Sequence, residues 1–445
     1  MRSLITGVIL ASLFFAGPAF TKTTESETIG TQEPEKLTII HAGQLLSIPG
    51  EAPLTSQSIF VKNNRIEKVL PGYIVQASDS ETDVSIINMQ DKFVLPGLMD
   101  MHVHLSFEYG VDSFEIKGVA DDGKGDSKAR RDDIAAFVEA MSNAEKTLQA
   151  GYTTVRNVGS EGWNIAALKQ AIASGRIEGP RVLSSMHTIR PGADSGSGAC
   201  NGVEGCRLAV RRQIDMGADL IKIYASCSGS KPCGNKNAPG IFLKDELEAI
   251  VQTAHTRQLT VAAHSHSARG IIDSLRAGVD SIEHGSHSTV ESHPLFRKND
   301  AYLVPTITVV QENVKGGLKE AEGAMRKVMQ DFVDNHGKNT MAAYKAGVKI
   351  AAGSDAGVTK HGENAHELQY YVEQGMPASE AIKTATVNGA ALIRKSDDLG
   401  TIEAGKLADI IAVSGNPLKD IKSLQTVDFV MKDGKVYRCE LPDCE

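Results

Sequence analysis

Residues 93–105 read FVLPGLMDMHVHL, and this stretch is the part of the sequence that best indicates the fold. It is an apolar run that ends in Asp100-Met101-His102-Val103-His104. Because alternate residues of a strand face the same side, His102 and His104 would point in one direction. Such a pair can chelate a metal ion, although two hydrogen-bonded or exposed histidines would give the same pattern. The stretch predicts a strand with a candidate metal pair at its carboxyl end.

Further short runs of the same kind follow, separated by longer stretches with helical periodicity. The runs lie at 153–159, 181–185, 219–226, 259–267, 280–285, 302–308 and 349–355, and the helical stretches include 133–150 and 243–258. Eight strands alternating with helices fit a (β/α)8 TIM barrel better than an open doubly wound sheet. We therefore predict the α/β class, with the barrel spanning 93–398.

Both ends of the chain have a different rhythm. Residues 36–92 and 399–445 contain short strand patterns separated by Gly, Pro, Asn and Asp. We expect these two segments to be the N-terminal and C-terminal parts of one small β-sandwich domain.

The composition is that of a globular protein with a sizeable core. The chain has 445 residues, of which 41% are hydrophobic and 23% charged, and its formal net charge is −8. Non-specific nucleic-acid binding needs a basic surface, so we expect no nucleic-acid partner. Only 5% of the residues are aromatic, which also disfavours base-stacking surfaces.

The first residues predict export. Residues 1–19 combine Arg2, an apolar run and small residues before a cleavage point after Ala19, which is typical of a signal peptide. Residues 20–35 are polar and are predicted to be a flexible leader. A membrane anchor is the alternative, but the apolar run is shorter than the roughly 20 residues that a spanning helix needs. We expect a periplasmic or secreted protein without a stable membrane anchor.

The cysteines fit that compartment. Six are present, as the local pairs Cys200 and Cys206, Cys227 and Cys233, and Cys439 and Cys444. An even number in an exported protein favours disulfides over free buried thiols. Six cysteines allow 15 connectivities, and the sequence does not choose among them.

In a barrel, chemistry is expected where strands end at the carboxyl side. The run 219–226 holds Lys222 between apolar neighbours, where an ammonium group would be costly to bury. A salt-bridged lysine would explain it, and so would a neutral amine carbamylated by CO2, which could bridge two cations. Tyr224 has the same face parity as Lys222, so its hydroxyl could reach the same end of the barrel.

Three later runs also end in ligand-type residues. The run 259–267 contains His264 and His266, the run 280–285 ends with Glu283-His284, and the run 349–355 ends with Asp355. Asp355 alone could be a helix cap or a turn residue. Together with the histidine pair and the lysine, these residues occupy the ends of the first, fourth, fifth, sixth and eighth strands. That convergence predicts a metal site.

With these residues in place, the chain resembles the amidohydrolase superfamily of metal-dependent hydrolases over about residues 37–436. The matching blocks are LPGLMDMHVHL, GYTTVRNVG, GPRVLSS, GADLIKIYAS, VAAHSHSARGI, AGVDSIEHGS, AAGSDAG, GMPASEAIKTATVNGAAL and GTIEAGKLADIIAVSGNPL. Within the superfamily it is similar to the prolidase-like, imidazolonepropionase-related branch, which includes Xaa-Pro and Xaa-Arg/Lys dipeptidases. Imidazolonepropionases lack a bridging lysine, so Lys222 points to the peptidase side.

The resemblance implies two divalent cations, zinc in this interpretation, and a hydroxide that they share. It assigns His102, His104 and Asp355 to one cation, and His264 and His284 to the other, with a CO2-derived carbamate on Lys222 bridging both. The bridging hydroxide would attack the scissile carbonyl, Asp355 would shuttle the proton, and Tyr224 would stabilise the oxyanion. His266 is the weaker candidate of its pair, because the family's motif uses the first histidine. His287 could contact substrate or be exposed, and exposure is the favoured interpretation.

Substrate contacts are expected from residues after the second and third strands. Arg156 and Arg190 could each bind a carboxylate, although an arginine in a structural ion pair is the alternative for both. Many relatives carry Gly-Gly-His-Gly after the third strand, and this chain has Pro191-Gly192-Ala193-Asp194-Ser195-Gly196 instead. His187 could take the place of the missing histidine.

We therefore expect an amidohydrolase that releases a C-terminal amino acid from a dipeptide, short peptide or N-acyl amino acid. Alternatives are an amidase acting on aromatic N-acyl amino acids such as ochratoxin-like amides, and a lactonase or esterase. A non-catalytic exported binding protein is the alternative of another class. Barrels of this kind often self-associate, which leaves a homo-oligomer open.

Overall fold

The computed structural model of the protein describes residues 35–78, 82–110, 125–160, 162–192, 198–227 and 237–441. The predicted signal peptide and all but the last residue of the predicted leader lie outside these ranges. Among the helices in these ranges, none is both long and apolar enough to cross a membrane.

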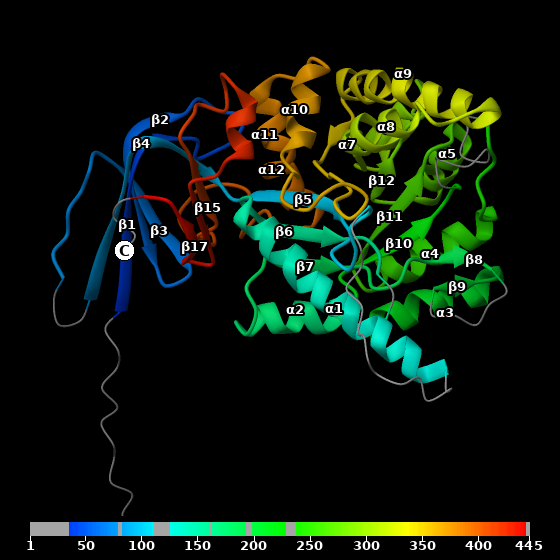
Figure 1. The fold of residues 1–445 in the computed structure, drawn as a ribbon, viewed down its shortest axis with the longest axis horizontal. Helices are drawn as coiled ribbons and strands as arrows, with labels where there is room; N and C mark the ends of the chain where they lie inside the picture. The colour runs from blue at the N-terminus through cyan, green and yellow to red at the C-terminus, as the bar shows by residue number, and fades with distance from the viewer. Residues whose placement is uncertain are drawn as a thin grey trace, which may run out of the picture. The chain divides into compact units, whose positions relative to one another are not determined.

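The predicted barrel is present, as parallel strands in two hydrogen-bonded groups of three and five (Figure 1). The first group is β5 (Leu98–Val103), β6 (Tyr152–Asn157) and β7 (Arg181–Ser184). The second is β10 (Leu220–Tyr224), β11 (Thr260–Ser265), β12 (Ser281–His284), β13 (Tyr302–Val304) and β14 (Lys349–Ile350).

Backbone hydrogen bonds close the two groups into a ring. On one side the Ile189 N–H donates to the Lys222 carbonyl at 2.8 Å, and the Tyr224 N–H donates to the Ile189 carbonyl at 3.0 Å. On the other side the Met101 N–H donates to the Ala352 carbonyl at 2.8 Å. The eight strand positions expected from the sequence therefore form one closed barrel, which brings their carboxyl ends to one rim.

Helices surround the barrel strands (Figure 1). They are α1 (Gly125–Gln149), α2 (Asn164–Ala173), α3 (Gly202–Asp215), α4 (Lys244–His255), α5 (Ala268–Ala277), α6 (His293–Lys298), α7 (Ile307–Val309), α8 (Lys315–Gly317), α9 (Gly323–Lys345), α10 (His366–Glu373), α11 (Ala378–Thr384) and α12 (Val387–Leu392), with a π-helix η2 (Val310–Val314) and a 3-10 helix η3 (Ile421–Gln425). One of them, α5, has a clear cap at each end. In α5, the Ser267 hydroxyl accepts from the Gly270 N–H, and Gly278 ends the helix at φ 95°.

A small β domain is built from both ends of the chain, as the sequence predicts. Its strands are β1 (Glu35–Leu45), β2 (Leu54–Lys62), β3 (Arg65–Pro71), β4 (Thr82–Pro96), β15 (Ile410–Val413), β16 (Phe429–Lys432) and β17 (Lys435–Cys439). They form one seven-stranded sheet in the order β17-β16-β15-β4-β1-β2-β3, rather than the two separate sheets of the expected β-sandwich. Alternation along β1 places Ile40 and Ile39 in apolar clusters on opposite faces of the sheet.

The central strand of this sheet continues directly into the barrel. β4 lies between β1 and β15, and only Gly97 separates it from β5. A Cβ atom at this position would collide with the side chain of Thr153, which explains the glycine. The small domain therefore holds the strand that leads to His102.

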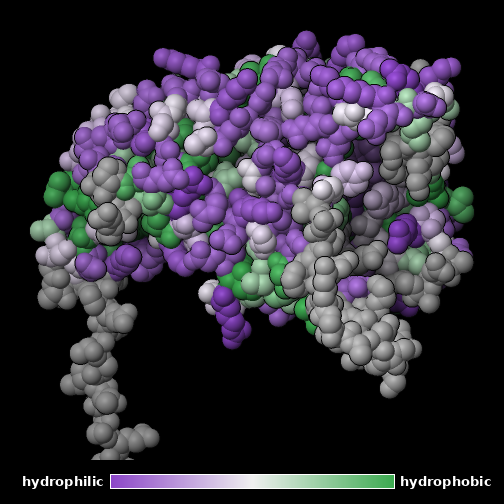
Figure 2. Space-filling view, viewed as in Figure 1, coloured by the Kyte–Doolittle hydropathy of each residue, from purple (hydrophilic) through white to green (hydrophobic). Residues whose placement is uncertain are grey.

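A disulfide joins Cys200 and Cys206, which links β9 (Ala199–Cys200) to α3. Cys227 and Cys439 are also disulfide-bonded. Cys233 and Cys444, their neighbours in the local pairs of the sequence, lie outside the described residues. β9 pairs with the other two-residue strand, β8 (Arg190–Pro191). Hydrophilic side chains cover most of the face in Figure 2, with small hydrophobic patches between them.

Candidate metal centre and substrate cavity

The first cluster of ligand-type residues lies where β5 and the segment after β14 end. The Nε2 atoms of His102 and His104 are 3.5 and 3.4 Å from Oδ1 of Asp355. That oxygen is buried and has no hydrogen-bond partner among the described residues. The three side chains, which we name the first half of the site, offer one ligand atom each within 4.8 Å of one another.

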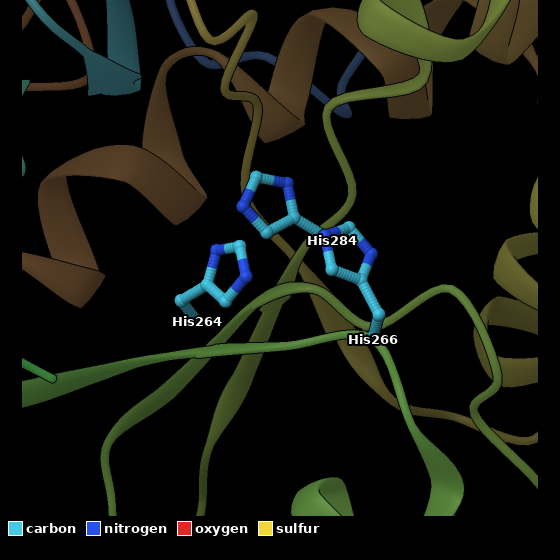
Figure 3. Close-up of side chains that lie close together, drawn as sticks. All are labelled: His264, His266 and His284. Atoms are coloured by element: carbon cyan, nitrogen blue, oxygen red, sulfur yellow. The ribbon is translucent and has the colours of Figure 1, made fainter. Parts of the chain in front are cut away.

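The second cluster lies at the ends of β11 and β12 and contains His264, His266 and His284. Their rings gather around a common space (Figure 3), with centroids 4.6 to 4.7 Å apart. Nε2 of His264 is buried and has no hydrogen-bond partner. We name these residues the second half of the site. The ring centroids of His102 and His284 are 4.9 Å apart, so the two halves adjoin.

Hydrogen bonds at Nδ1 orient three of these histidines. His102 Nδ1 is 2.7 Å from Glu283 Oε2, and His104 Nδ1 is 2.9 Å from the Gly159 carbonyl. His284 Nδ1 is 2.7 Å from the Thr306 hydroxyl. A partner at Nδ1 leaves the Nε2 lone pair for a cation, as is usual for histidine ligands.

Lys222 is buried between the two halves, with 2% of its surface exposed. Burial lowers the pKa of Lys222 to about 8, although the negative charges of Glu283 and Asp355 act in the opposite direction. Its charge also lowers the pKa values of His102 in the first half and His264 in the second, after the larger effect of their burial. The lowered pKa makes the neutral amine more accessible than in an exposed lysine, although the ammonium form still predominates at pH 7.

Asp355 has an unusual backbone and an unusual environment. Its φ is 59°, and the φ values of His284 and Thr306 are 67° and 55°. Non-glycine residues in this region cost of order 1–3 kcal/mol each and are concentrated at functional sites. Burial raises the pKa of Asp355 to about 7. A divalent cation beside the carboxylate would favour its ionised form again.

The structure contradicts the prediction that Arg156 contacts substrate. Arg156 is 1% exposed, inside the barrel rather than at its rim. It donates to Glu283 at 2.7 Å, to the Met101 carbonyl at 2.6 Å and to the Ser281 hydroxyl at 3.1 Å. These bonds occupy every nitrogen of the guanidinium group, so Arg156 is a structural arginine.

Glu283 is the residue that the sequence reasoning missed. It joins Arg156 to His102 and is fully buried. The Arg156 guanidinium keeps the pKa of Glu283 far below its usual range, despite burial, which acts in the opposite direction. Its position directly before the candidate ligand His284 was the sequence signal that could have identified Glu283. A carboxylate in a β-branched strand needs a buried partner.

His287 is buried rather than exposed, contrary to the prediction. It is 6% exposed, and its ring packs against Phe332 of α9 with centroids 5.3 Å apart. Its Nε2 lies 3.6 Å from Asp331 Oδ2. The cover comes from a helix that begins 36 residues later in the chain, at Gly323, which local sequence could not show.

Both halves of the site open into a cavity of about 1390 Å3. Its lining includes the predicted residues His102, His104, Lys222, His264, His284 and Asp355, as well as Tyr224, His187 and Arg190. Apolar residues, among them Phe107, Val310, Met329 and Phe332, line much of the rest. Burial raises the pKa of Tyr224, while the charge of Arg190 partly opposes this effect. The two side chains therefore interact electrostatically.

These donors fit the metals that the sequence implies. Imidazole nitrogens and carboxylate oxygens are the usual ligands of zinc in catalytic sites. The unpartnered buried atoms, Nε2 of His264 and Oδ1 of Asp355, would each gain a partner from a bound cation. The described residues thus provide two candidate cation positions with Lys222 between them.

Comparisons with known proteins identify the family of the chain. The model of the amidohydrolase family matches residues 93–437. Ochratoxinase from Aspergillus niger is 31% identical over 452 residues, covering 92% of this chain and 88% of that protein. A crystal structure of a Xaa-Pro dipeptidase with bound methionine has a TM-score of 0.79 at 37% identity, covering 90% of this chain and 100% of that chain. The crystal structure of the A. niger ochratoxinase has a TM-score of 0.76 at 28% identity, covering 92% of this chain and 96% of that chain.

The extent of the family match, the fold and the chemistry of the site residues all indicate the same family. The chain belongs to the amidohydrolase family, as a metal-dependent enzyme of the branch that contains these prolidase-like proteins.

Proposed function

We propose that the protein hydrolyses an amide bond and releases a C-terminal amino acid from a dipeptide, short peptide or N-acyl amino acid. The observation that carries this proposal is the arrangement of the cavity. Two clusters of ligand-type side chains line the cavity together with Lys222, and Arg190 lines the same space near Tyr224. A carboxylate bound by the arginine would leave the neighbouring amide over the two clusters.

In this proposal His102, His104 and Asp355 hold one divalent cation, and His264 and His284 hold the other, with zinc as the metal that suits these donors. Lys222 carries a carbamate formed with CO2 and bridges the two. When bound, such cations supply an activated water at neutral pH and polarise the scissile carbonyl. The buried position and lowered pKa of Lys222 support the carbamate, because only a neutral amine reacts with CO2.

The chain's own residues then have distinct tasks. Asp355 receives a proton and delivers it to the leaving amine. The Tyr224 hydroxyl stays protonated, since burial raises its pKa, and donates to the substrate oxygen that becomes negative. Arg190, with His187 nearby in the lining, binds the carboxylate of the departing amino acid.

An aromatic N-acyl amino acid is the second candidate substrate. The apolar part of the cavity, with Phe107, Met329 and Phe332, could hold a large acyl group. The similarity to ochratoxinase favours the same class. A lactone or ester would meet the same cations, and those substrates belong in the same screen.

Export to the periplasm or the medium completes the proposal. It rests on the pattern of residues 1–19 and on the Cys200–Cys206 disulfide, because disulfides persist in oxidising compartments.

The experiment compares matched substrates in wild type and Arg190→Ala. One substrate is an N-acyl amino acid, and the other is its C-terminal amide. We expect kcat/KM for the free acid to fall about 10- to 100-fold in the variant, as for loss of a charged hydrogen bond, with little change for the amide. Arg207→Ala, on the exposed side of α3, is the control. Turnover of lactones with no turnover of any amide would contradict the proposal.

A further inference from the structure

His266 has no task in the proposed reaction, although it belongs to the second half of the site. It follows β11 and lines the cavity. Its ring stacks on that of His284, with an interplanar angle of 15° and centroids 4.7 Å apart. A nitrogen lone pair lies in the plane of its ring, so a cation in the plane of His284 lies outside the plane of the stacked His266 ring. His266 is therefore badly placed to share the cation of His284.

A chain of hydrogen bonds behind His266 has donor and acceptor roles that can be assigned at each step. It begins at the Pro305 carbonyl, which can only accept, 2.8 Å from His336 Nε2. His336 Nε2 must then carry the hydrogen. His336 is 1% exposed, and burial lowers its pKa to about 4, so the ring is neutral and its Nδ1 is an acceptor.

The Ser286 hydroxyl connects His336 to His266, so the roles at His336 determine those at His266. Its oxygen lies 2.8 Å from His336 Nδ1 and 2.8 Å from His266 Nδ1. The hydroxyl has one hydrogen, which it must donate to His336. It therefore accepts from His266 Nδ1–H. With the hydrogen on Nδ1, the neutral His266 ring bears its lone pair on Nε2.

That lone pair faces the cavity. Among the described residues, none forms a hydrogen bond with His266 Nε2. The ring meets Phe332 edge to face with centroids 5.1 Å apart, and Val310 and Met329 line the same cavity. The acceptor thus borders apolar side chains as well as the rings of His264 and His284.

We propose that His266 is a substrate-binding residue whose Nε2 accepts a hydrogen bond from an N–H or O–H group on the acyl half of the substrate. This inference rests on the proposed function. It defines the preferred acyl group as an apolar body with a hydrogen-bond donor, such as the amino group of a dipeptide with a hydrophobic first residue or the hydroxyl of an aromatic acid. Ser286 and His336 are positioning residues that fix the tautomer.

The first test reads the tautomer directly. Imidazole 15N resonances are recorded for the metal-loaded enzyme with 15N-labelled histidine, and His266→Gln assigns the resonances of His266. We expect a protonated Nδ1 and an unprotonated Nε2, and Ser286→Ala should mix the two tautomers. A proton on Nε2 in the wild type would overturn the proposal. This measurement is independent of turnover, so it decides the tautomer even if no amide is hydrolysed.

The second test uses substrates that differ only in the donor. An amino-bearing and a hydroxyl-bearing acyl substrate are each compared with the analogue that has hydrogen in its place. In Ser286→Ala, KM for the donor substrates should rise about 10-fold, with kcat and metal content unchanged, while the analogues keep their KM. Ser286→Thr, which retains the hydroxyl, should restore the low KM. Whichever donor responds identifies the acyl class, and an equal effect on substrates and analogues would overturn the proposal.

Metal analysis of a His266 variant tests the alternative role, in which His266 is a metal ligand. His266→Ala should bind as many metal equivalents as the wild type, because the stacked ring is not a ligand. Loss of one equivalent would make His266 a metal ligand and would overturn the proposal, while leaving the proposed hydrolysis intact.

Discussion

The two halves of the site use the same ligand chemistry but are supported differently. In the first half, His102 is held by Glu283, which is paired with the buried Arg156, and Asp355 adds a carboxylate. In the second half, His284 is held by the Thr306 hydroxyl and His266 by the Ser286 hydroxyl. A charged partner holds His102 in the first half, where His104 has the neutral Gly159 carbonyl, and the hydroxyl partners in the second half are neutral.

From this difference we infer that the first half is the more rigid and the second half the more adaptable. A charge-assisted bond is about twice as strong as a neutral one, and a carboxylate partner raises the basicity of a ligating imidazole. We therefore expect the first half to bind its cation more tightly. The second half is the one next to the mostly apolar wall with Phe332 and Val310, where substrate variation is easiest to accommodate.

Substitution of Lys222, the residue that both halves share, should cause the largest loss of activity. Lys222→Ala removes the proposed bridge, so kcat/KM should fall by more than the roughly 100-fold that is typical for loss of a supporting residue. Steady-state hydrolysis and metal analysis, with bicarbonate present, provide the measurement. The exposed barrel lysine Lys349, changed to Ala, is the control. A Lys222→Ala enzyme as fast as the parent would refute the bridge.

The ionic support of the first half should dominate stability. Glu283→Gln leaves the Arg156 guanidinium buried without its counter-ion, and the free energy of unfolding should fall by about 3–5 kcal/mol. Chemical denaturation measures this change. The exposed Arg65–Asp398 pair is the matched control, and Asp398→Asn should cost less than about 1 kcal/mol. Equal losses in the two variants would remove the distinction between the halves.

The neutral support of the second half should matter less for stability and more for its cation. Thr306→Val keeps a branched side chain at φ 55° but removes the hydroxyl partner of His284. The affinity for one of the two metal equivalents should weaken about 10-fold. Competition with a metal-binding dye measures it, and Thr306→Ser should behave like the wild type. If the tighter equivalent weakens instead, the assignment of the halves is reversed.

The smallest expected effect is the order of metal release. A brief exposure to chelator should remove one equivalent before the other, with affinities that differ by about 10-fold, or about 1.4 kcal/mol. Metal content against time shows this as two phases. In Glu283→Gln the phases should merge, because both halves then have neutral support. A single phase in the wild type would contradict the comparison.

The sequence was sufficient for the barrel and for the placement of most site residues at its rim. Alternation within residues 93–105 places His102 and His104 together, and parallel closure brings His264, His284 and Asp355 to the same cavity. These outcomes follow from strand periodicity, which is local. The eighth strand was also recognisable, although only Lys349–Ile350 is regular and the chain reaches Asp355 through a left-handed turn.

What the sequence could not show depends on contacts between distant elements. Arg156 looks like a rim residue by its place after the second strand, but its partner Glu283 belongs to the sixth. His287 looks exposed until α9 covers it with Phe332. The direction of the hydrogen bonds at His266 is set by His336 on the same helix and by the Pro305 carbonyl.

The continuity of β4 and β5 has a consequence for the order of events during synthesis. β4 carries the chain through Gly97 into the strand of His102, and its neighbours in the sheet are β1 from the start of the chain and β15 from near its end. A ribosome must therefore finish almost the whole protein before β4 has both neighbours. The first half of the metal centre is expected to mature last, so the growing chain should be unable to hydrolyse anything until it is nearly complete.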